Sequence, residues 1–212
     1  MNESYEENRQ IGENETYICS LIRTDSVEEF ITYVNQTNLK ISTATIKPSF
    51  FETNQFLLGK KNITLIEYAA FFGSIQIFQY LQMNKIKLTQ SLWLFAIHGR
   101  NPELIHRLED NKIIPKDSTH FECFKEAIKC HHNEIAVYIK DNLLTNKKID
   151  KNFSLFVLQN CNYSFLPDDI LDIKFGFFIL CQYQLYKIAQ LYLENKNIQP
   201  IPIINIGDDF II

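Results

Sequence analysis

The residues of this chain that could carry chemistry are concentrated in one short stretch, which contains Cys123, Cys130, His131 and His132. Thiols and imidazoles are preferred ligands of zinc, and together they form the nucleophile and base of thiol enzymes. Cys123 and Cys130 are about two helical turns apart, so they could share one face of a helix. Zinc ligands, however, usually come in pairs two to four residues apart, and a second such pair is missing.

The simpler interpretation of this stretch is a cysteine within a helix, followed by a His–His turn between two helices. No local motif around any of the five cysteines indicates a nucleophile, and the six glycines are isolated, so they form no phosphate-binding loop. We therefore predict a non-enzymatic chain with no catalytic residue, no metal and no cofactor. A metal-dependent or thiol enzyme centred on Cys123, Cys130 and His131 is the alternative.

The elements that must position these residues follow from a helix-pair pattern that repeats along the chain. In each copy an alanine (Ala69, Ala96 or Ala127) lies eight positions before an apolar pair. The alanines recur at intervals of 27 and 31 residues, which suit a helix–turn–helix unit and exclude propeller blades of about 40 residues. Because such a unit cannot bury its apolar face alone, we predict an all-α solenoid of stacked helix pairs.

Capping residues indicate where the helices begin. A capping box uses a threonine or serine and a glutamate three residues later to satisfy backbone donors at a helix start. Three segments match it: Thr64 with Glu67, Ser26 with Glu29, and Ser49 with Glu52. Asn101 before Pro102 supplies an N-cap and a proline at the first helical position. These signals predict helices that begin next to each of the four sites.

Composition narrows the class of protein. Hydrophobic residues make up 46% of the 212 residues, enough for a buried core. The formal net charge is −4 and no basic stripe accumulates, which argues against nucleic acid as a partner. The five cysteines are scattered, as is typical of reduced thiols, and the polar N-terminus offers no signal-peptide core. We therefore predict a cytoplasmic protein without membrane insertion, with a nuclear location left open.

Three strings carry a resemblance to a known family: residues 65–73, 96–101 and 126–133. In the first copy, Thr64 matches a helix-opening threonine, Ala69 and Ala70 paired alanines, Gly73 an inter-helix turn and Leu81 a second-helix leucine. This copy resembles an ankyrin repeat. More narrowly, residues 63–138 are similar to a divergent ankyrin-like family of unknown function that is expanded in trichomonad parasites. The resemblance covers about residues 16–196 and implies a scaffold or adaptor that binds proteins on its concave face.

The chain departs from the ankyrin pattern in its loops. Leu65, Leu92 and Phe124 stand where ankyrin repeats usually have proline, and the inter-repeat segments lack the Asp-Gly tips of β-hairpin fingers. We therefore expect the fingers to be reduced or absent. The predicted layout is a flexible tail over residues 1–15, an array of about five helix pairs over 16–199, and a C-terminal tail over 200–212. Irregular segments near 41–61 and 147–174 are either degenerate repeats or insertions, and the last pair is expected within 177–195.

The outward positions of the inner helices line the concave groove in ankyrin-like stacks. By register, the predicted partner-binding residues, called the stripe below, are Tyr68, Phe71, Phe95, His98, Glu126 and Lys129. Aromatic anchors dominate interface energetics, so the partner expected here is a protein. Two alternatives stay open: the aromatic rings pack under neighbouring loops as core, or the chain is a short family member without an independent role.

Overall fold

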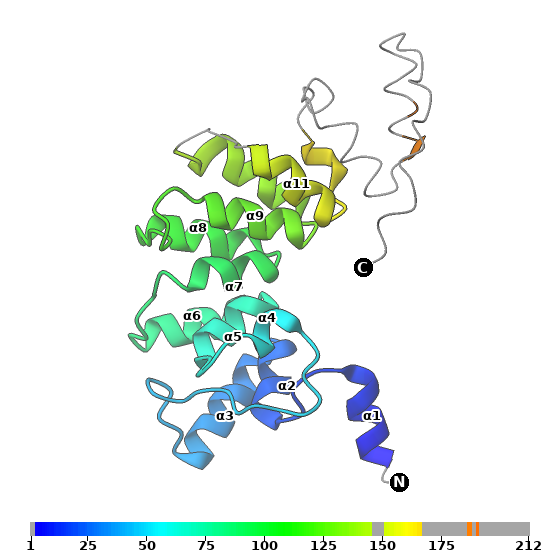
Figure 1. The fold of residues 1–212 in the computed structure, drawn as a ribbon. Helices are drawn as coiled ribbons and strands as arrows, with labels where there is room; N and C mark the ends of the chain where they lie inside the picture. The colour runs from blue at the N-terminus through cyan, green and yellow to red at the C-terminus, as the bar shows by residue number, and fades with distance from the viewer. Residues whose placement is uncertain (1–2, 146–150, 167–185, 188–189, 191–212) are drawn as a thin grey trace. The chain divides into compact units, whose positions relative to one another are not determined.

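The computed structural model describes residues 3–145, 151–166, 186, 187 and 190, and Figure 1 shows the chain. Two compact units, Met1–Lys147 and Lys148–Ile212, are each described by themselves. The described residues form helices and no β-strand, which confirms the all-α class; two threonines, Thr45 and Thr64, form an isolated bridge. None of the described helices combines the length and apolar character that crossing a membrane requires.

The helices of the first unit are α1 (Glu3–Ile11), α2 (Tyr17–Arg23), α3 (Val27–Thr37), α4 (Gln55–Leu58), α5 (Leu65–Phe72), α6 (Ile75–Met83), α7 (Leu92–His98), α8 (Pro102–Asp110), α9 (Phe121–Lys129), α10 (Asn133–Tyr138) and a π-helical turn, η1 (Ile139–Leu143). In the second unit, the described part of the segment near 147–174 contains α11 (Lys151–Gln159) and the 3₁₀ turn η2 (Tyr163–Phe165). Of the last pair expected within 177–195, all but residues 186, 187 and 190 lie outside the described residues, as does the tail over 200–212.

The helices of the first unit pack as successive pairs: α2 with α3, α5 with α6, α7 with α8, and α9 with α10. Figure 1 shows these pairs following one another along the unit. The first helices of the pairs contact one another in the order α2, α5, α7, α9, and α3 contacts α6 in the second row. Ala69, Ala96 and Ala127 are buried on α5, α7 and α9, where small side chains let neighbouring helices approach closely.

Two glycines make the approach of α5 to α7 close enough for their backbones to touch. Gly73 ends α5 in the left-handed conformation, with φ of 70°, and a Cβ placed on it would lie 2.5 Å from the carbonyl oxygen of Gly99. A Cβ on Gly99 would in turn overlap the carbonyl oxygen of Ala70. Because all of these atoms belong to the backbone, no side-chain rotation could relieve the overlap.

A hydrogen bond joins each helix pair to the one before it. In each case the N-cap side chain of a second helix bonds a backbone carbonyl near the inter-helix turn of the preceding pair. The three bonds are Ser74 Oγ to Ile22 O, Asn101 Nδ2 to Gly73 O at 3.1 Å, and His132 Nδ1 to Ile97 O at 2.7 Å. The three carbonyl groups lie at helix ends, and two of them, those of Ile22 and Ile97, also accept backbone amides of their own turns. Successive helix pairs are therefore linked by polar as well as apolar contacts.

Two of the four predicted helix starts have the expected cap. Thr64 and Glu67 form the capping box of α5, and Asn101 accepts a hydrogen bond from the Glu103 amide at the start of α8. Ser26 precedes α3 but makes no side-chain cap bond. The helix expected at Ser49 is absent from the described residues 49–54: the Ser49 hydroxyl oxygen accepts from the Phe51 amide, and the Glu52 carboxylate accepts from the Asn54 amide. The short helix of this segment, α4, begins at residue 55 with Asn54 as its N-cap.

The N-terminal residues 3–11 form α1, where the sequence predicts a flexible tail. Gly12, with φ of 67°, follows this helix, and its amide closes the last turn onto Asn8 O. The ring of Tyr5 contacts that of Phe51, with centroids 5.3 Å apart. The structure thus has a helix over residues 3–11 of the predicted tail, and this helix contacts a distant loop that local sequence patterns cannot reveal.

Candidate functional site

The short helix α4 covers part of the stripe on α5 and α7. The Phe56 ring stacks on Phe71 with centroids 5.8 Å apart and meets the edge of Phe95 at 5.0 Å. It also lies 4.2 Å from the His98 ring, and Figure 1 shows α4 beside α5. An irregular loop thus places one aromatic ring against three predicted partner-binding residues.

The aromatic half of the stripe belongs to the core. Tyr68, Phe71 and Phe95 are only 1%, 8% and 3% exposed. Rings as deeply buried as those of Tyr68 and Phe95 cannot contact a partner while the fold is intact, and Phe71 exposes only a small part of its surface, beside a cavity described below. The prediction that they form an accessible surface is corrected, and the alternative interpretation of these rings as core describes what the structure has. The rings of Phe71 and Phe95 are covered by Phe56 of α4.

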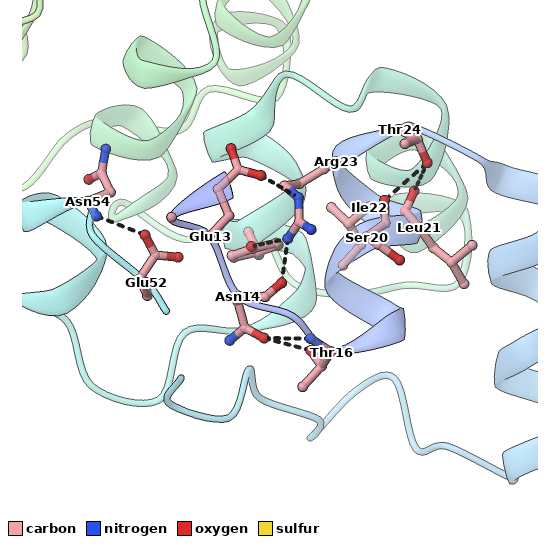
Figure 2. Close-up of polar contacts among 12 residues, drawn as sticks. Glu13, Asn14, Thr16, Ser20, Leu21, Ile22, Arg23, Thr24, Glu52 and Asn54 are labelled. Atoms are coloured by element: carbon pink, nitrogen blue, oxygen red, sulfur yellow. Dashed lines mark hydrogen bonds and ion pairs between the residues drawn. The ribbon is translucent and has the colours of Figure 1, made fainter. Parts of the chain in front are cut away.

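The Tyr68 hydroxyl belongs to a network of hydrogen bonds and an ion pair around Arg23. The Arg23 guanidinium donates to the Tyr68 hydroxyl at 3.3 Å and to the carbonyl oxygen of Asn14 at 2.6 Å, and it pairs with Glu13 at 2.7 Å. Figure 2 shows Arg23 between Glu13 and Asn14. Burial raises the pKa of Tyr68, so this hydroxyl stays protonated. Its role is to anchor the segment that follows α1 onto α2 and α5.

The segment after α1 is also tied to the loop that precedes α4. Asn14 is buried and donates from Nδ2 to the Lys47 carbonyl oxygen at 2.7 Å. The amide and hydroxyl of Thr53 both donate to the Gly12 carbonyl oxygen, at 3.0 and 2.8 Å. On the same loop, the Asn54 amide donates to the Glu52 carboxylate (Figure 2). These bonds fix the path of residues 12–14 and 45–54 next to the inner helices.

The polar half of the stripe forms a compact group at the ends of α7 and α9. His98 is the last residue of α7, and its Nε2 lies 2.9 Å from Glu126 Oε1 on α9. Cys130 follows α9 directly, and its Sγ lies 3.6 and 3.7 Å from the two ring nitrogens of His98. These three residues, called the His98 cluster, have ligand atoms within 4.8 Å of one another. Lys129 Nζ lies 3.7 Å from Glu126.

The charges in the His98 cluster follow from its partial burial. The hydrogen bond from His98, aided by the Lys129 charge, lowers the pKa of Glu126 against the opposing effect of burial. Burial, with the Glu126 carboxylate nearby, raises the pKa of the Cys130 thiol to about 11. The free thiol is therefore protonated at neutral pH. A nucleophilic cysteine needs the opposite shift, so this arrangement does not activate Cys130 for attack.

The centre proposed from sequence for an enzyme, around Cys123, Cys130 and His131, is not assembled in the part of the chain that the structure describes. Cys123 is buried within α9, and burial raises its pKa. His131 has φ of 57° in the turn between α9 and α10, and His132 bonds the backbone of the preceding pair. The structure thus has the His–His turn of the simpler interpretation. Cys130 lies next to His98 of α7 instead.

A cavity of about 500 Å³ opens beside the His98 cluster. Its wall combines acidic, aromatic and cationic side chains, which include Glu13, Glu52, Phe56, Phe72, His98 and Lys129. The side chain of Lys129 is 55% exposed, whereas that of Glu126 is 16% exposed. Of the six residues in the predicted stripe, Phe71, His98 and Lys129 therefore line this cavity, Phe71 with only a small exposed part, and Glu126 contacts both His98 and Lys129.

Two residues of this site were not singled out from the sequence. Phe56 lies in an irregular segment with no repeat register, and Arg23 lies at the end of a helix with no motif around it. The closeness of Glu126 to Cys130 can be predicted from the sequence, because residues four positions apart lie on the same face of a helix. Their meeting with His98 depends on how α7 packs against α9.

In comparisons with protein-family models, with curated proteins and with solved structures, no significant match was found for this chain.

Proposed function

We propose that the first unit is an ankyrin-like helix-pair solenoid that acts as a non-enzymatic protein-binding module. The observation that carries this proposal is the cavity beside the inner helices, at which His98, Lys129 and Phe72 remain accessible. The binding surface is therefore the polar end of the stripe, with Phe72 in place of the buried aromatic rings. Successive first helices in mutual contact, small residues between them and one exposed edge are features of repeat scaffolds.

The chemistry of the cavity favours a protein segment that brings a carboxylate. Glu126 already accepts a hydrogen bond from His98 at 2.9 Å, while its distance to Lys129 is 3.7 Å. Glu13 is engaged by Arg23. Lys129 is thus only weakly paired with Glu126, and its side chain is largely exposed. An acidic side chain of the partner would pair with it. The Phe72 ring beside it offers an apolar contact of the kind that anchors interfaces.

Free thiols support the assignment of this module to the cytoplasm. Four of the five cysteines are described by the structure, and each of them is unpaired with another cysteine. Thiols in this state persist in reducing compartments. The raised pKa of both Cys123 and Cys130 supports a binding role over thiol catalysis.

The binding surface is tested by reversing one charge. We expect Lys129→Glu to reduce the yield of a captured partner by at least about 10-fold, because like charges placed opposite each other at an interface cost several kcal/mol. The measurement is affinity capture from cell lysate with quantitative mass spectrometry, after circular dichroism has shown that the variant folds.

The matched control is Lys140→Glu, which makes the same change of charge at an exposed site on η1. It should leave the yield unchanged. A partner that is lost equally from both variants would show a dependence on net charge alone. A partner retained by both would place the contact elsewhere, and either result rejects the cavity as the binding surface.

A further inference from the structure

We propose that the His98 cluster binds a divalent transition metal, zinc above all, through one imidazole nitrogen of His98, a carboxylate oxygen of Glu126 and the Sγ of Cys130. This ion site is independent of whether a protein occupies the neighbouring cavity. Nitrogen, oxygen and sulfur ligands together suit zinc, which accepts all three, while magnesium and calcium select oxygen.

The separations within the cluster are close to those of a tetrahedral site. Zinc–sulfur and zinc–nitrogen bonds of about 2.3 and 2.0 Å place the two ligand atoms about 3.5 Å apart at a tetrahedral angle. Cys130 Sγ lies 3.6 and 3.7 Å from the two ring nitrogens of His98, and therefore to the side of both lone pairs, so the ring would turn about its Cβ–Cγ bond to aim one nitrogen at the ion. The carboxylate oxygen of Glu126, now 2.9 Å from His98 Nε2, would move outward by about 0.5 Å to reach its own tetrahedral position.

The ligands are positioned by secondary structure before an ion arrives. Glu126 and Cys130 are four residues apart, which places both on one face at the end of α9. His98 ends α7, and α7 packs against α9. The His98 ring is confined by Phe71, stacked at 4.9 Å, and by Phe56 at 4.2 Å. Ligands held on helices, with a ring confined by its neighbours, lose little freedom on binding.

The site can supply the ion with a fourth ligand and with two balancing negative charges. Three protein ligands leave one position of a tetrahedral ion open, and His98 borders the cavity of about 500 Å³, from which water can supply the fourth ligand. Formation of the sulfur–metal bond releases the thiol proton to solvent. The resulting thiolate and the Glu126 carboxylate then balance the two positive charges of the ion.

Cobalt(II) provides a direct test, because a cobalt–thiolate bond gives a near-ultraviolet charge-transfer band. The wild-type chain should bind one equivalent of cobalt with this band, and zinc should displace it. Cys130→Ser should abolish the band, and His98→Asn should weaken cobalt binding by at least about 10-fold, the loss seen even for residues that only support a metal ligand.

Two variants control for adventitious binding. Cys161→Ser removes an exposed thiol from the second unit. His106→Asn removes the other histidine–glutamate pair, in which His106 lies 3.1 Å from Glu109. Both should keep the wild-type spectrum. A band that survives in Cys130→Ser, or disappears in Cys161→Ser, would overturn the site, as would a wild-type chain that gives no band.

A measurement on the unmodified chain keeps the test decisive if the ligand variants fail to fold. Zinc should slow the alkylation of Cys130 by N-ethylmaleimide, followed by peptide mass spectrometry, and leave the rate at Cys161 unchanged. Equal rates at Cys130 with and without zinc would reject the proposal.

Discussion

Gly99→Ala should lower the free energy of unfolding by about 3 kcal/mol, the upper part of the range for overpacked sites. The added methyl group would overlap the carbonyl oxygen of Ala70 and approach the Gly73 amide nitrogen to 2.9 Å. Both obstacles are backbone atoms of α5 and its C-terminal turn, so α5 and α7 must separate to admit it. Urea unfolding followed by circular dichroism measures the loss.

Gly59→Ala is the matched control for this substitution. Gly59 follows α4 with φ of −74°, and a Cβ there would lie 3.3 Å from Gln55 O within the same turn. Alanine tolerates this backbone conformation, so stability should change by less than about 0.5 kcal/mol. Similar losses at both positions would mean that the close approach of α5 to α7 does not limit the stack.

Phe56→Ala should cost about 2 kcal/mol of stability and open the aromatic half of the stripe. A fully buried phenylalanine costs about 3–5 kcal/mol on truncation, and Phe56 is half-buried, so a smaller loss is expected. The substitution removes the ring that contacts Phe71, Phe95 and His98. Hydrogen exchange of the α5 and α7 amides should accelerate along with the loss of stability.

Phe50→Ala makes the same truncation on a ring that is fully exposed. We expect it to change the free energy of unfolding by less than about 0.5 kcal/mol and to leave the exchange of α5 and α7 unaltered. If Phe56→Ala behaved like Phe50→Ala, α4 would not cover the stripe. The buried state of Phe71 and Phe95 would then need another cause.

The parts of the fold that sequence predicts well are those set by short-range patterns. The spacing of Ala69, Ala96 and Ala127 predicted three of the helix pairs, because each alanine and its apolar partners lie within one pair. The caps at Thr64 and Asn101 predicted their helix starts, because a cap involves residues three or fewer positions apart. Such signals can be recognised in the sequence without knowledge of how the pairs pack.

The predictions that failed depended on contacts between distant segments. The capping box at Ser49 is intact in the sequence, but Ser49 donates to the distant Glu15, and the Glu52 carboxylate accepts from the Asn54 amide instead of closing the box. The helix α1 contains few apolar residues and contacts a loop through Tyr5 and Phe51. The aromatic rings of the stripe lie on the first helices of their pairs, as the register predicts, but the positions of Phe56 beside Phe71 and Phe95 and of Arg23 beside Tyr68 depend on distant segments.

The candidate site was predicted in part for the same reasons. Glu126, Lys129 and Cys130 follow from the periodicity of α9, and His98 follows from the equivalent position on α7. Their meeting point follows from the packing of α7 against α9, which brings Cys130 Sγ to within 3.6 Å of His98. Sequence spacing instead joined Cys130 to Cys123 and His131, which share its helix or turn but not its surroundings.

Site-specific photo-crosslinking is the most direct test of the proposed binding surface. A photoreactive benzoylphenylalanine in place of Phe72, at the cavity wall, should form a covalent adduct with the partner protein. The same residue in place of Phe50, which is exposed outside the cavity, should form none. An adduct at position 72 that Lys129→Glu abolishes is the predicted result. Adducts at position 50 with none at position 72 would contradict the assignment of the cavity as the binding surface.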